Sequence, residues 1–537
     1  MIRAQRLPDR APPPIVDDPA LLQGFLEDAS GSPPGRTPGV LRLTDEAEAA
    51  TWLRGSDGPV LIQAARSSLT GGAVPHGECV LSVERMDRIG RVEADRVTCQ
   101  PGVRLCDLQE HLRQAGLYYP PVPTYQQAMV GGTVSTNAGG AATFKYGVTR
   151  DWVVGLRVLL ANGDLLVIER GEHLAHREQS FRILLTDGEE LKVPVPCHEL
   201  PPLRKITAGY HSADPMDLID LFVGAEGTLG MISEVTLAVV PLPPTVVAGL
   251  ISLYDTAASL RLAAELRHAT LSARQNHDRE APDVRAIEWL DGGSLDLLRA
   301  HGEDRRRRIR LPAEARAALI FEAELPREIT DAEAEEVLSR WFEGKPVAAG
   351  PLGHLLRIIQ EGGGLDSLEL AFPGDAGRRA DLAELREAVP TRVSEILAER
   401  RREEPHVHKV GGDMIVPFEE LPGMIDYYRE GFARRGLEQA TWGHLSDGNL
   451  HANAIPRDGA ETRAAVEALL EFAAEAARRG GAPLSEHGVG RSPVKQRMMR
   501  DFLGYAAIEG MHRIKRALDP RWRLAPGVLF PGPPGAP

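Results

Sequence analysis

Three strings of glycine and small hydroxyl residues interrupt the first half of the chain, and they restrict its fold more than any other feature. They cover residues 67–72, 131–140 and 222–232. Glycine allows a positive φ or a close approach of the backbone to a ligand. Each string therefore marks either a turn or a surface that can pack against a bulky group. Short β-rich runs such as 60–62 and 153–161 lie between the strings and favour an α+β domain.

Each string has a ligand-binding interpretation and a plain structural alternative. The first can hold a diphosphate through its N–H groups, or it can be an ordinary loop. The second suits backbone packed on a flat ring system, or a tight turn region. The third by itself predicts a hairpin turn. A Rossmann-type site is excluded, because no G-x-G-x-x-G string follows an early strand and opens a helix.

The second half contains a histidine-rich hairpin pattern at residues 442–453. Asp447-Gly448 is typical of a two-residue turn, and with that turn His444 pairs with His451. Asn453 then lies on the same side by period-two alternation. Two facing imidazoles favour a metal site, and a hairpin without metal is the alternative.

A second polar string, residues 485–488, places Glu486 and His487 side by side in a glycine-rich loop before a helix. A surface loop is the plain alternative. Farther upstream, Arg386 lies in a helical stretch and offers a cation, with a solvated helix arginine as its alternative.

In this order the strings resemble the FAD-linked oxidase family of the p-cresol methylhydroxylase/vanillyl-alcohol oxidase type, in its D-lactate dehydrogenase, glycolate oxidase and D-2-hydroxyglutarate dehydrogenase branch. The resemblance runs from about residue 38 to 530. It implies an α+β fold with a two-part FAD-binding domain and an α+β cap domain. We expect an N-terminal arm and helix at 1–37, an FAD-binding domain at 38–245 with a β excursion at about 163–212, and a cap domain at 246–537 whose last segment returns to the flavin.

The resemblance implies that FAD, held without a covalent bond, is wrapped by the three strings. The residues that it assigns to the cofactor are Ser67, Ser68, Leu69, Thr70, Gly71, Gly72, Pro121, Gly131, Gly132, Thr133, Ser135, Thr136, Asn137, Gly139, Gly140, Tyr146, Gly147, Glu226, Gly227, Gly230 and Ile232.

The same resemblance assigns roles to the polar strings of the second half. A divalent metal, commonly zinc, is expected on His444, His451 and Glu486. His487 is expected to be the general base. The substrate contacts are expected from Asn453 and Arg386.

The implied activity is oxidation of a small D-2-hydroxy acid, such as lactate, glycolate or 2-hydroxyglutarate, to the 2-oxo acid. Hydride passes to flavin N5, and an iron–sulfur subunit, an electron-transfer flavoprotein, a quinone or a cytochrome then takes the electrons. Two alternatives stay open: a non-redox flavoprotein synthase of the alkylglycerone-phosphate synthase type, and a flavin-binding subunit of an electron-transfer complex. A homodimer is compatible with all three.

The chain departs from the family at several positions. Ala64, Arg66 and Ser68 stand where the family often has glycine, so we expect φ to stay negative there, or the diphosphate to be contacted differently. Gly411 falls where the family has a lysine, and residues 525–528 replace an Asn-Pro-Gly-Lys string. The identity of the hydroxy acid therefore stays open.

Composition excludes several other classes of protein. Lys plus Arg is 62 against 76 for Asp plus Glu, a formal net charge of -14 that disfavours nucleic acid as a partner. The four cysteines are scattered and form no metal-binding or iron–sulfur pattern. No apolar run is long enough to span a bilayer, and the N-terminus lacks a signal-peptide pattern. We expect a cytoplasmic protein, or one held at a membrane surface by a partner.

Overall fold

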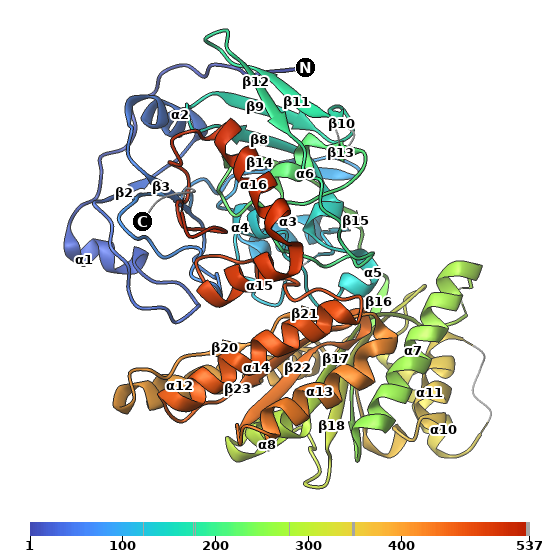
Figure 1. Ribbon diagram of the computed structural model, residues 1–537. Coiled ribbons are helices and arrows are strands. Elements are labelled where there is room, and N and C mark those ends of the chain that lie inside the picture. Colours follow the sequence, from blue (N-terminus) through green and yellow to red (C-terminus); the bar gives the residue numbers. More distant parts are fainter. Residues whose placement is uncertain (122, 176, 178, 279, 346–349, 533–537) are drawn as a thin grey trace. The chain divides into compact units, whose positions relative to one another are not determined.

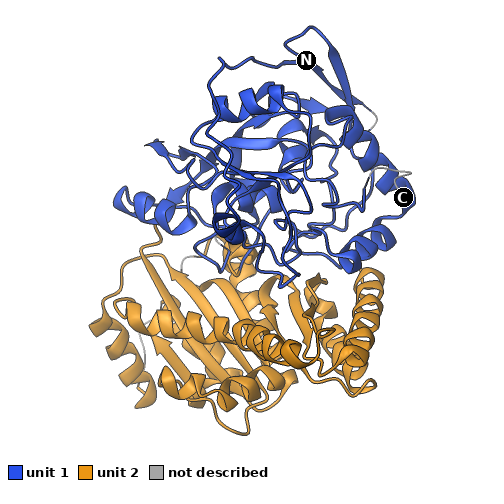
Figure 2. Cartoon of the chain, turned by 90° about the vertical axis from the view of Figure 1, so that its left-hand side faces the viewer, with its two compact units in different colours: residues 1–140, 147–241, 482–537 blue, residues 141–146, 242–481 orange. Residues whose placement is uncertain are grey.

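In the computed structural model the chain divides into two compact units (Figure 2). The described residues are 1–532 except 122, 176, 178, 279 and 346–349. Unit 1 comprises 1–140, 147–241 and 482–537, and unit 2 comprises 141–146 and 242–481. The last segment of the sequence therefore folds with the first. Both units combine helices with sheets, which confirms the expected α+β class.

Two sheets form the centre of unit 1. The larger has five antiparallel strands, β5 (Ile89–Val92), β6 (Arg96–Cys99), β14 (Met231–Ala238), β8 (Val153–Leu159) and β9 (Leu165–Glu169), in that order. Strands β14, β8 and β9 are labelled in Figure 1. The smaller is parallel, in the order β2 (Val40–Arg42), β4 (Cys79–Ser82) and β3 (Val60–Gln63). Apolar side chains of both sheets, including Leu41, Leu81 and Leu159, share one buried core.

Shorter elements complete unit 1. The remaining strands are β1 (Ile2–Arg3), β7 (Leu117–Tyr118), β10 (Leu174–Ala175), β11 (Ser180–Leu184), β12 (Glu190–Pro194), β13 (Met216–Asp217) and β15 (Val240–Pro241). The helices are α1 (Pro19–Leu22), α2 (Glu46–Gly55), α3 (Leu105–Gln114), α4 (Val130–Thr136), α6 (Leu218–Phe222), α15 (Pro493–Leu503) and α16 (Tyr505–Leu518), with 3-10 turns η1 (Gln23–Phe25) and η2 (Thr149–Trp152).

Local sequence signals account for several of these elements. Asp18 caps α1 by accepting a hydrogen bond from Ala20 N at 2.8 Å, as its side chain predicts. Strands β11 and β12 pair as the hairpin expected around Asp187-Gly188. The hairpin predicted at residues 222–232 is wrong, because Asp217 caps helix α6 and the chain reaches β14 through a glycine loop.

Unit 2 is built on one antiparallel sheet of eight strands. Seven of them follow the order β19 (Leu368–Ala371), β16 (Thr245–Leu253), β18 (Ala317–Leu325), β17 (Asp283–Asp291), β22 (Gln439–His444), β23 (Asn449–Ala454) and β20 (Val410–Gly411), and β21 (Met414–Ile415) pairs with β23. The helices are α5 (Thr143–Tyr146), α7 (Thr256–Asn276), α8 (Gly292–Ala300), α9 (Glu303–Arg306), α10 (Asp331–Phe342), α11 (Pro351–Glu361), α12 (Ala376–Glu403), α13 (Leu421–Ala433) and α14 (Gly459–Arg478), with 3-10 turns η3 (Leu365–Ser367), η4 (Phe418–Glu420) and η5 (Leu445–Asp447).

Helices bury both faces of this sheet. On one face Leu290 and Trp442 pack in a core with Leu385 and Val389 of α12. On the other face Trp289 donates a hydrogen bond from Nε1 to Ser259 Oγ of α7 at 3.0 Å. Strands covered on both sides read as nearly continuous apolar runs, so an ionisable side chain on such a strand needs a specific partner.

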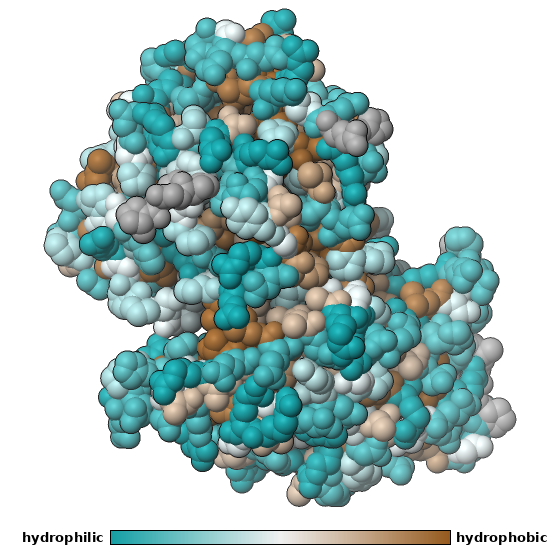
Figure 3. Space-filling view, in the orientation of Figure 1, coloured by the Kyte–Doolittle hydropathy of each residue, from teal (hydrophilic) through white to brown (hydrophobic). Residues whose placement is uncertain are grey.

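Hydrophilic residues cover most of the face shown in Figure 3, in keeping with 26% charged residues in the sequence. Among the described residues, we find no helix with both the length and the apolar character that crossing a membrane requires.

Candidate functional site

The three glycine strings come together within unit 1. Glu226 N donates to Ser135 O at 2.8 Å, which joins the third string to the second. A Cβ placed on Gly132 of the second string would lie 3.5 Å from the Cβ of Ala64, so the loop that leads into the first string is also adjacent. Segments about 160 residues apart in the sequence therefore lie in one region of unit 1.

The loop that carries the predicted base is tied to the same strings. The two carboxylate oxygens of Glu226 accept hydrogen bonds from Val489 N and Gly490 N, each at 2.8 Å. Arg491 N then donates to Thr70 O of the first string at 2.9 Å. Residues 486–491 thus belong to the same region of unit 1 as the cofactor strings.

The predicted cofactor residues lie in unit 1 with one exception. Tyr146 ends helix α5 in unit 2, where its hydroxyl donates to Glu324 Oε1 at 2.7 Å. Pro121 lies in unit 1, and its neighbour Val122 is outside the described residues.

The expectation of negative φ in the loop 64–68 is wrong at Arg66, whose φ is 57°. Such a conformation costs a residue other than glycine about 1–3 kcal/mol. Its guanidinium carbon lies 5.0 Å from the ring centroid of Phe25, and its carbonyl accepts from Ala29 N at 3.1 Å. These contacts of Arg66 with the N-terminal arm offset the strain of its positive φ.

The environment of Glu226 predicts a pH-dependent stability. Burial raises the pKa of Glu226 to about 7, although the two backbone N–H donors act in the opposite direction. A raised folded-state pKa stabilises the fold below the unfolded-state pKa, and this contribution is lost as pH rises through about 7. We expect the free energy of unfolding to fall between about pH 5 and 8, and Glu226→Gln to flatten that slope, as measured by chemical denaturation across the range. An equal slope in Glu226→Gln and in the exposed control Glu172→Gln would contradict the assignment.

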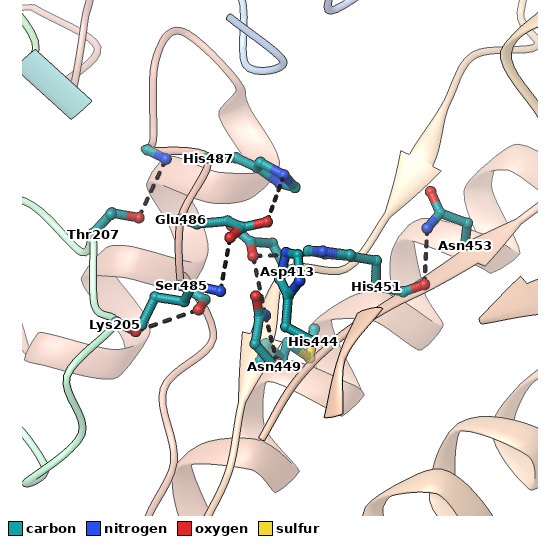
Figure 4. Close-up of polar contacts among 12 residues, drawn as sticks. Lys205, Thr207, Asp413, His444, Asn449, His451, Asn453, Ser485, Glu486 and His487 are labelled. Atoms are coloured by element: carbon teal, nitrogen blue, oxygen red, sulfur yellow. Dashed lines mark hydrogen bonds and ion pairs between the residues drawn. The ribbon is translucent and has the colours of Figure 1, made fainter. Parts of the chain in front are cut away.

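Glu486 and His487 are positioned by a segment that the sequence analysis did not single out. Lys205 is fully buried, and its Nζ lies 2.9 Å from Glu486 Oε2 (Figure 4). Thr207 Oγ1 accepts from Gly488 N at 3.2 Å. His487 Nε2 lies 3.4 Å from Glu486 Oε1. The buried ammonium of Lys205 thus lies beside the carboxylate of Glu486 and compensates its negative charge.

The two histidines of the predicted hairpin lie in unit 2, and the predicted pairing between them is wrong. His444 pairs with Asn449, and His451 pairs with Trp442. The two imidazoles are therefore diagonal neighbours on the hairpin, with ring centroids 5.5 Å apart and planes at 87°.

The connection between β22 and β23 explains the shift. The turn is the 3-10 turn η5 followed by Gly448, whose φ is 88° and whose N–H donates to Leu445 O at 3.1 Å. Ser446 Oγ accepts from Ile287 N of β17 at 3.2 Å. A contact from a third strand thus favours a longer turn than Asp447-Gly448 alone predicts.

A buried aspartate supports the second histidine. Asp413 Oδ1 accepts from Asn449 Nδ2 at 3.3 Å and lies 3.8 Å from His451 Nδ1 (Figure 4). Asn453 Nδ2 donates to His451 O at 3.0 Å, while its Oδ1 occupies the space where a Cβ on Gly411 would lie. The absence of a side chain at Gly411 therefore leaves room for the amide of Asn453.

The first histidine and the predicted substrate arginine meet at one glutamate. Glu288 Oε1 contacts His444 Nδ1, and Glu288 Oε2 accepts from Arg386 Nε at 2.7 Å. Arg386 Nη1 also donates to Glu387 Oε1 at 2.6 Å. Burial acts to raise the pKa of Glu288, but His444 and Arg386 outweigh it and hold the pKa below its usual range. The carboxylate is therefore ionised.

Lys205, Asp413 and Glu288 are the site residues that sequence reasoning missed. Glu288 carried a signal, since it interrupts the apolar run of residues 286–290. Lys205 and Asp413 lie in glycine-containing segments that mix polar and apolar residues, so a charged residue does not stand out there.

The predicted metal donors come from both units. His444 and His451 belong to unit 2, and Glu486 belongs to unit 1. Imidazole nitrogens and carboxylate oxygens are both donors that zinc accepts.

Comparison with known proteins gives matches over most of the sequence. Residues 39–169 match the FAD binding domain family, and residues 259–529 match the FAD linked oxidases, C-terminal domain. The chain is 30% identical to the glycolate oxidase subunit GlcD of Bacillus subtilis over 484 residues, which cover 88% of this chain and 84% of that protein. It is 26% identical to a D-lactate dehydrogenase of Anaerostipes hadrus, with coverages of 88% and 84%.

One further relative and one solved structure also match this chain over most of its length. A D-2-hydroxyglutarate dehydrogenase of Stutzerimonas stutzeri is 27% identical over 477 residues, 87% of this chain and 84% of that protein. Among solved structures, an alkyldihydroxyacetonephosphate synthase has a TM-score of 0.60 at 14% identity, covering 95% of this chain and 82% of that chain. That likeness concerns the fold.

Proposed function

This chain belongs to the FAD-linked oxidases, in the branch of the D-lactate, glycolate and D-2-hydroxyglutarate dehydrogenases, and we propose that it oxidises a small D-2-hydroxy acid to the 2-oxo acid. Bound FAD supplies the two-electron acceptor for this chemistry. The proposed electron acceptors beyond the flavin are an iron–sulfur subunit, an electron-transfer flavoprotein, a quinone or a cytochrome.

The observation that carries the proposal is the attachment of the His487 loop to the glycine strings of unit 1. The carboxylate of Glu226 holds Val489 and Gly490, two and three residues beyond the imidazole. A base that takes a proton from a substrate hydroxyl has to lie near the ring that takes the hydride from the adjacent carbon. The strings suit FAD, because positive φ and the absence of a side chain at Gly71 and Gly227 let the backbone approach a ligand closely.

We propose the following roles for the chain's own residues. His487 accepts the proton of the α-hydroxyl. Asn453 donates a hydrogen bond to the substrate, and Arg386 attracts the substrate carboxylate with the part of its guanidinium that neither Glu288 nor Glu387 uses.

His444, His451 and Glu486 are the proposed ligands of a divalent metal. Their nitrogen and oxygen donors suit zinc, and a metal bound there would act as a Lewis acid toward the substrate oxygens. Lys205 Nζ lies 2.9 Å from Glu486 Oε2, so the proposed metal would share this carboxylate with a buried ammonium.

Anaerobic titration tests the proposal. We expect the purified FAD-loaded protein to lose its yellow colour on addition of one or more of D-lactate, glycolate and D-2-hydroxyglutarate, with D-enantiomers faster than L-enantiomers. Treatment with a chelator is expected to slow this reduction, and zinc to restore it. Retention of the oxidised flavin spectrum with every acid of the panel would instead favour the non-redox synthase or the electron-transfer subunit.

A further inference from the structure

Glu288 occupies a position that the apolar pattern of its strand does not explain. It lies on β17 directly opposite His444 of β22 in the register of the sheet. Its side chain points to the face covered by α12, which carries Arg386. Only 7% of its surface is exposed. Sheet register and helix packing thus bring one carboxylate between an imidazole and a guanidinium.

The chemistry of these contacts determines where the imidazole proton lies. A carboxylate that pairs with a guanidinium accepts hydrogen bonds, and Glu288 Oε2 accepts one from Arg386 Nε at 2.7 Å. His444 therefore has to carry a hydrogen on Nδ1 to contact Oε1. In the neutral ring the lone pair is then on Nε2, the nitrogen that faces away from Glu288.

We propose that Glu288 is a positioning residue that holds His444 as the Nδ1–H tautomer and so presents Nε2 to a divalent cation, with Arg386 fixing the carboxylate in turn. This inference rests on the metal site proposed above. It gives Arg386 a role in the protein interior that is separate from any substrate contact.

Packing alone does not account for this arrangement. His444, Glu288 and Arg386 are all buried beside a core of leucine, valine and tryptophan. Apolar residues of the same size would fill that space without the desolvation cost of charged groups. Carboxylate partners of metal-binding histidines, in contrast, commonly contribute 10–100-fold to metal affinity.

Cobalt(II) titration of the FAD-loaded protein tests the proposal, since the absorption bands of cobalt report both affinity and coordination. We expect Glu288→Gln to weaken cobalt binding about 10–100-fold and to change the band shape. The matched control is Glu322→Gln on the neighbouring strand β18, where the carboxylate pairs with Arg285. Cobalt affinity in Glu288→Gln within twofold of the wild type would overturn the proposal.

Histidine ¹⁵N chemical shifts of the metal-free protein provide a second readout, and His444→Gln identifies the signal. We expect Nδ1–H in the wild type and a mixture of tautomers in Glu288→Gln. An Nε2–H tautomer in the wild type overturns the proposal even if the variant fails to fold. If the wild type binds no cobalt, the proposed metal fails, while these shifts still decide the role of Glu288.

Discussion

Replacing His487 by alanine is expected to slow anaerobic reduction of the bound flavin by the hydroxy acid by about 10²–10⁴-fold. The imidazole is the proposed acceptor of the hydroxyl proton, and without it the proton has to pass to a weaker or less well placed base. Because residues 489 and 490 are held through their backbone N–H groups, the loop and the cofactor site should keep their shape. Rapid-mixing measurement of the flavin absorbance gives the rate.

Two controls are needed to interpret the rate measured for His487→Ala. His408→Ala removes an exposed imidazole of unit 2 and should leave the rate unchanged. Metal content is measured in the same samples, because His487 adjoins Glu486, a proposed ligand. A rate within tenfold of the wild type at equal FAD and metal content would exclude His487 as the base. Unchanged turnover of a larger complex would favour a flavin-binding subunit.

The sequence predicted the elements whose signals are local. The glycine strings predicted turns in unit 1, and Asp18 predicted the start of α1. These signals are local, because a helix cap or a positive φ depends on a few neighbouring residues. The turn residues also predicted a hairpin that carries His444 and His451. They did not predict its register, because the turn depends on a hydrogen bond between Ser446 and β17, more than 150 residues earlier in the chain.

The sequence did not predict the partners of the proposed site residues, because these partners also lie far away along the chain. Lys205 reaches Glu486 across 281 positions, and Glu288 reaches His444 across 156. Such pairs depend on sheet register and on the return of the last segment to unit 1, neither of which a local pattern records. Long-range hydrogen bonds and ion pairs within each unit therefore determine how the proposed site residues of that unit are arranged.

Each unit also supplies a polar partner to one of its own proposed ligands. Lys205 compensates Glu486 within unit 1, and Glu288 holds His444 within unit 2. A buried carboxylate or imidazole that already has a partner needs little rearrangement when a cation binds. Ligand geometry can therefore be fixed in either unit before metal is added.

Lys515→Met is expected to lower the free energy of unfolding of the FAD-loaded protein by about 3–5 kcal/mol, as measured by chemical denaturation. Lys515 and Asp519 form an ion pair at 2.5 Å in which each side chain is 1% exposed. Burial lowers the pKa of Lys515, and Asp519 opposes that shift. Removing the ammonium leaves a buried carboxylate whose charge has lost its cation.

The same ammonium joins the C-terminal segment to the third glycine string. Its Nζ donates to Thr228 O at 2.6 Å and to Leu524 O at 2.8 Å, so Lys515→Met should also weaken FAD binding. Arg516→Met, an exposed change on the same helix, is the matched control. Adding Asp519→Asn to Lys515→Met should recover part of the lost stability, because the amide carries no charge that needs a partner. Equal stability of the single and double variants would show that the ion pair is not the cause, and that the two carbonyl contacts of Lys515 carry the effect.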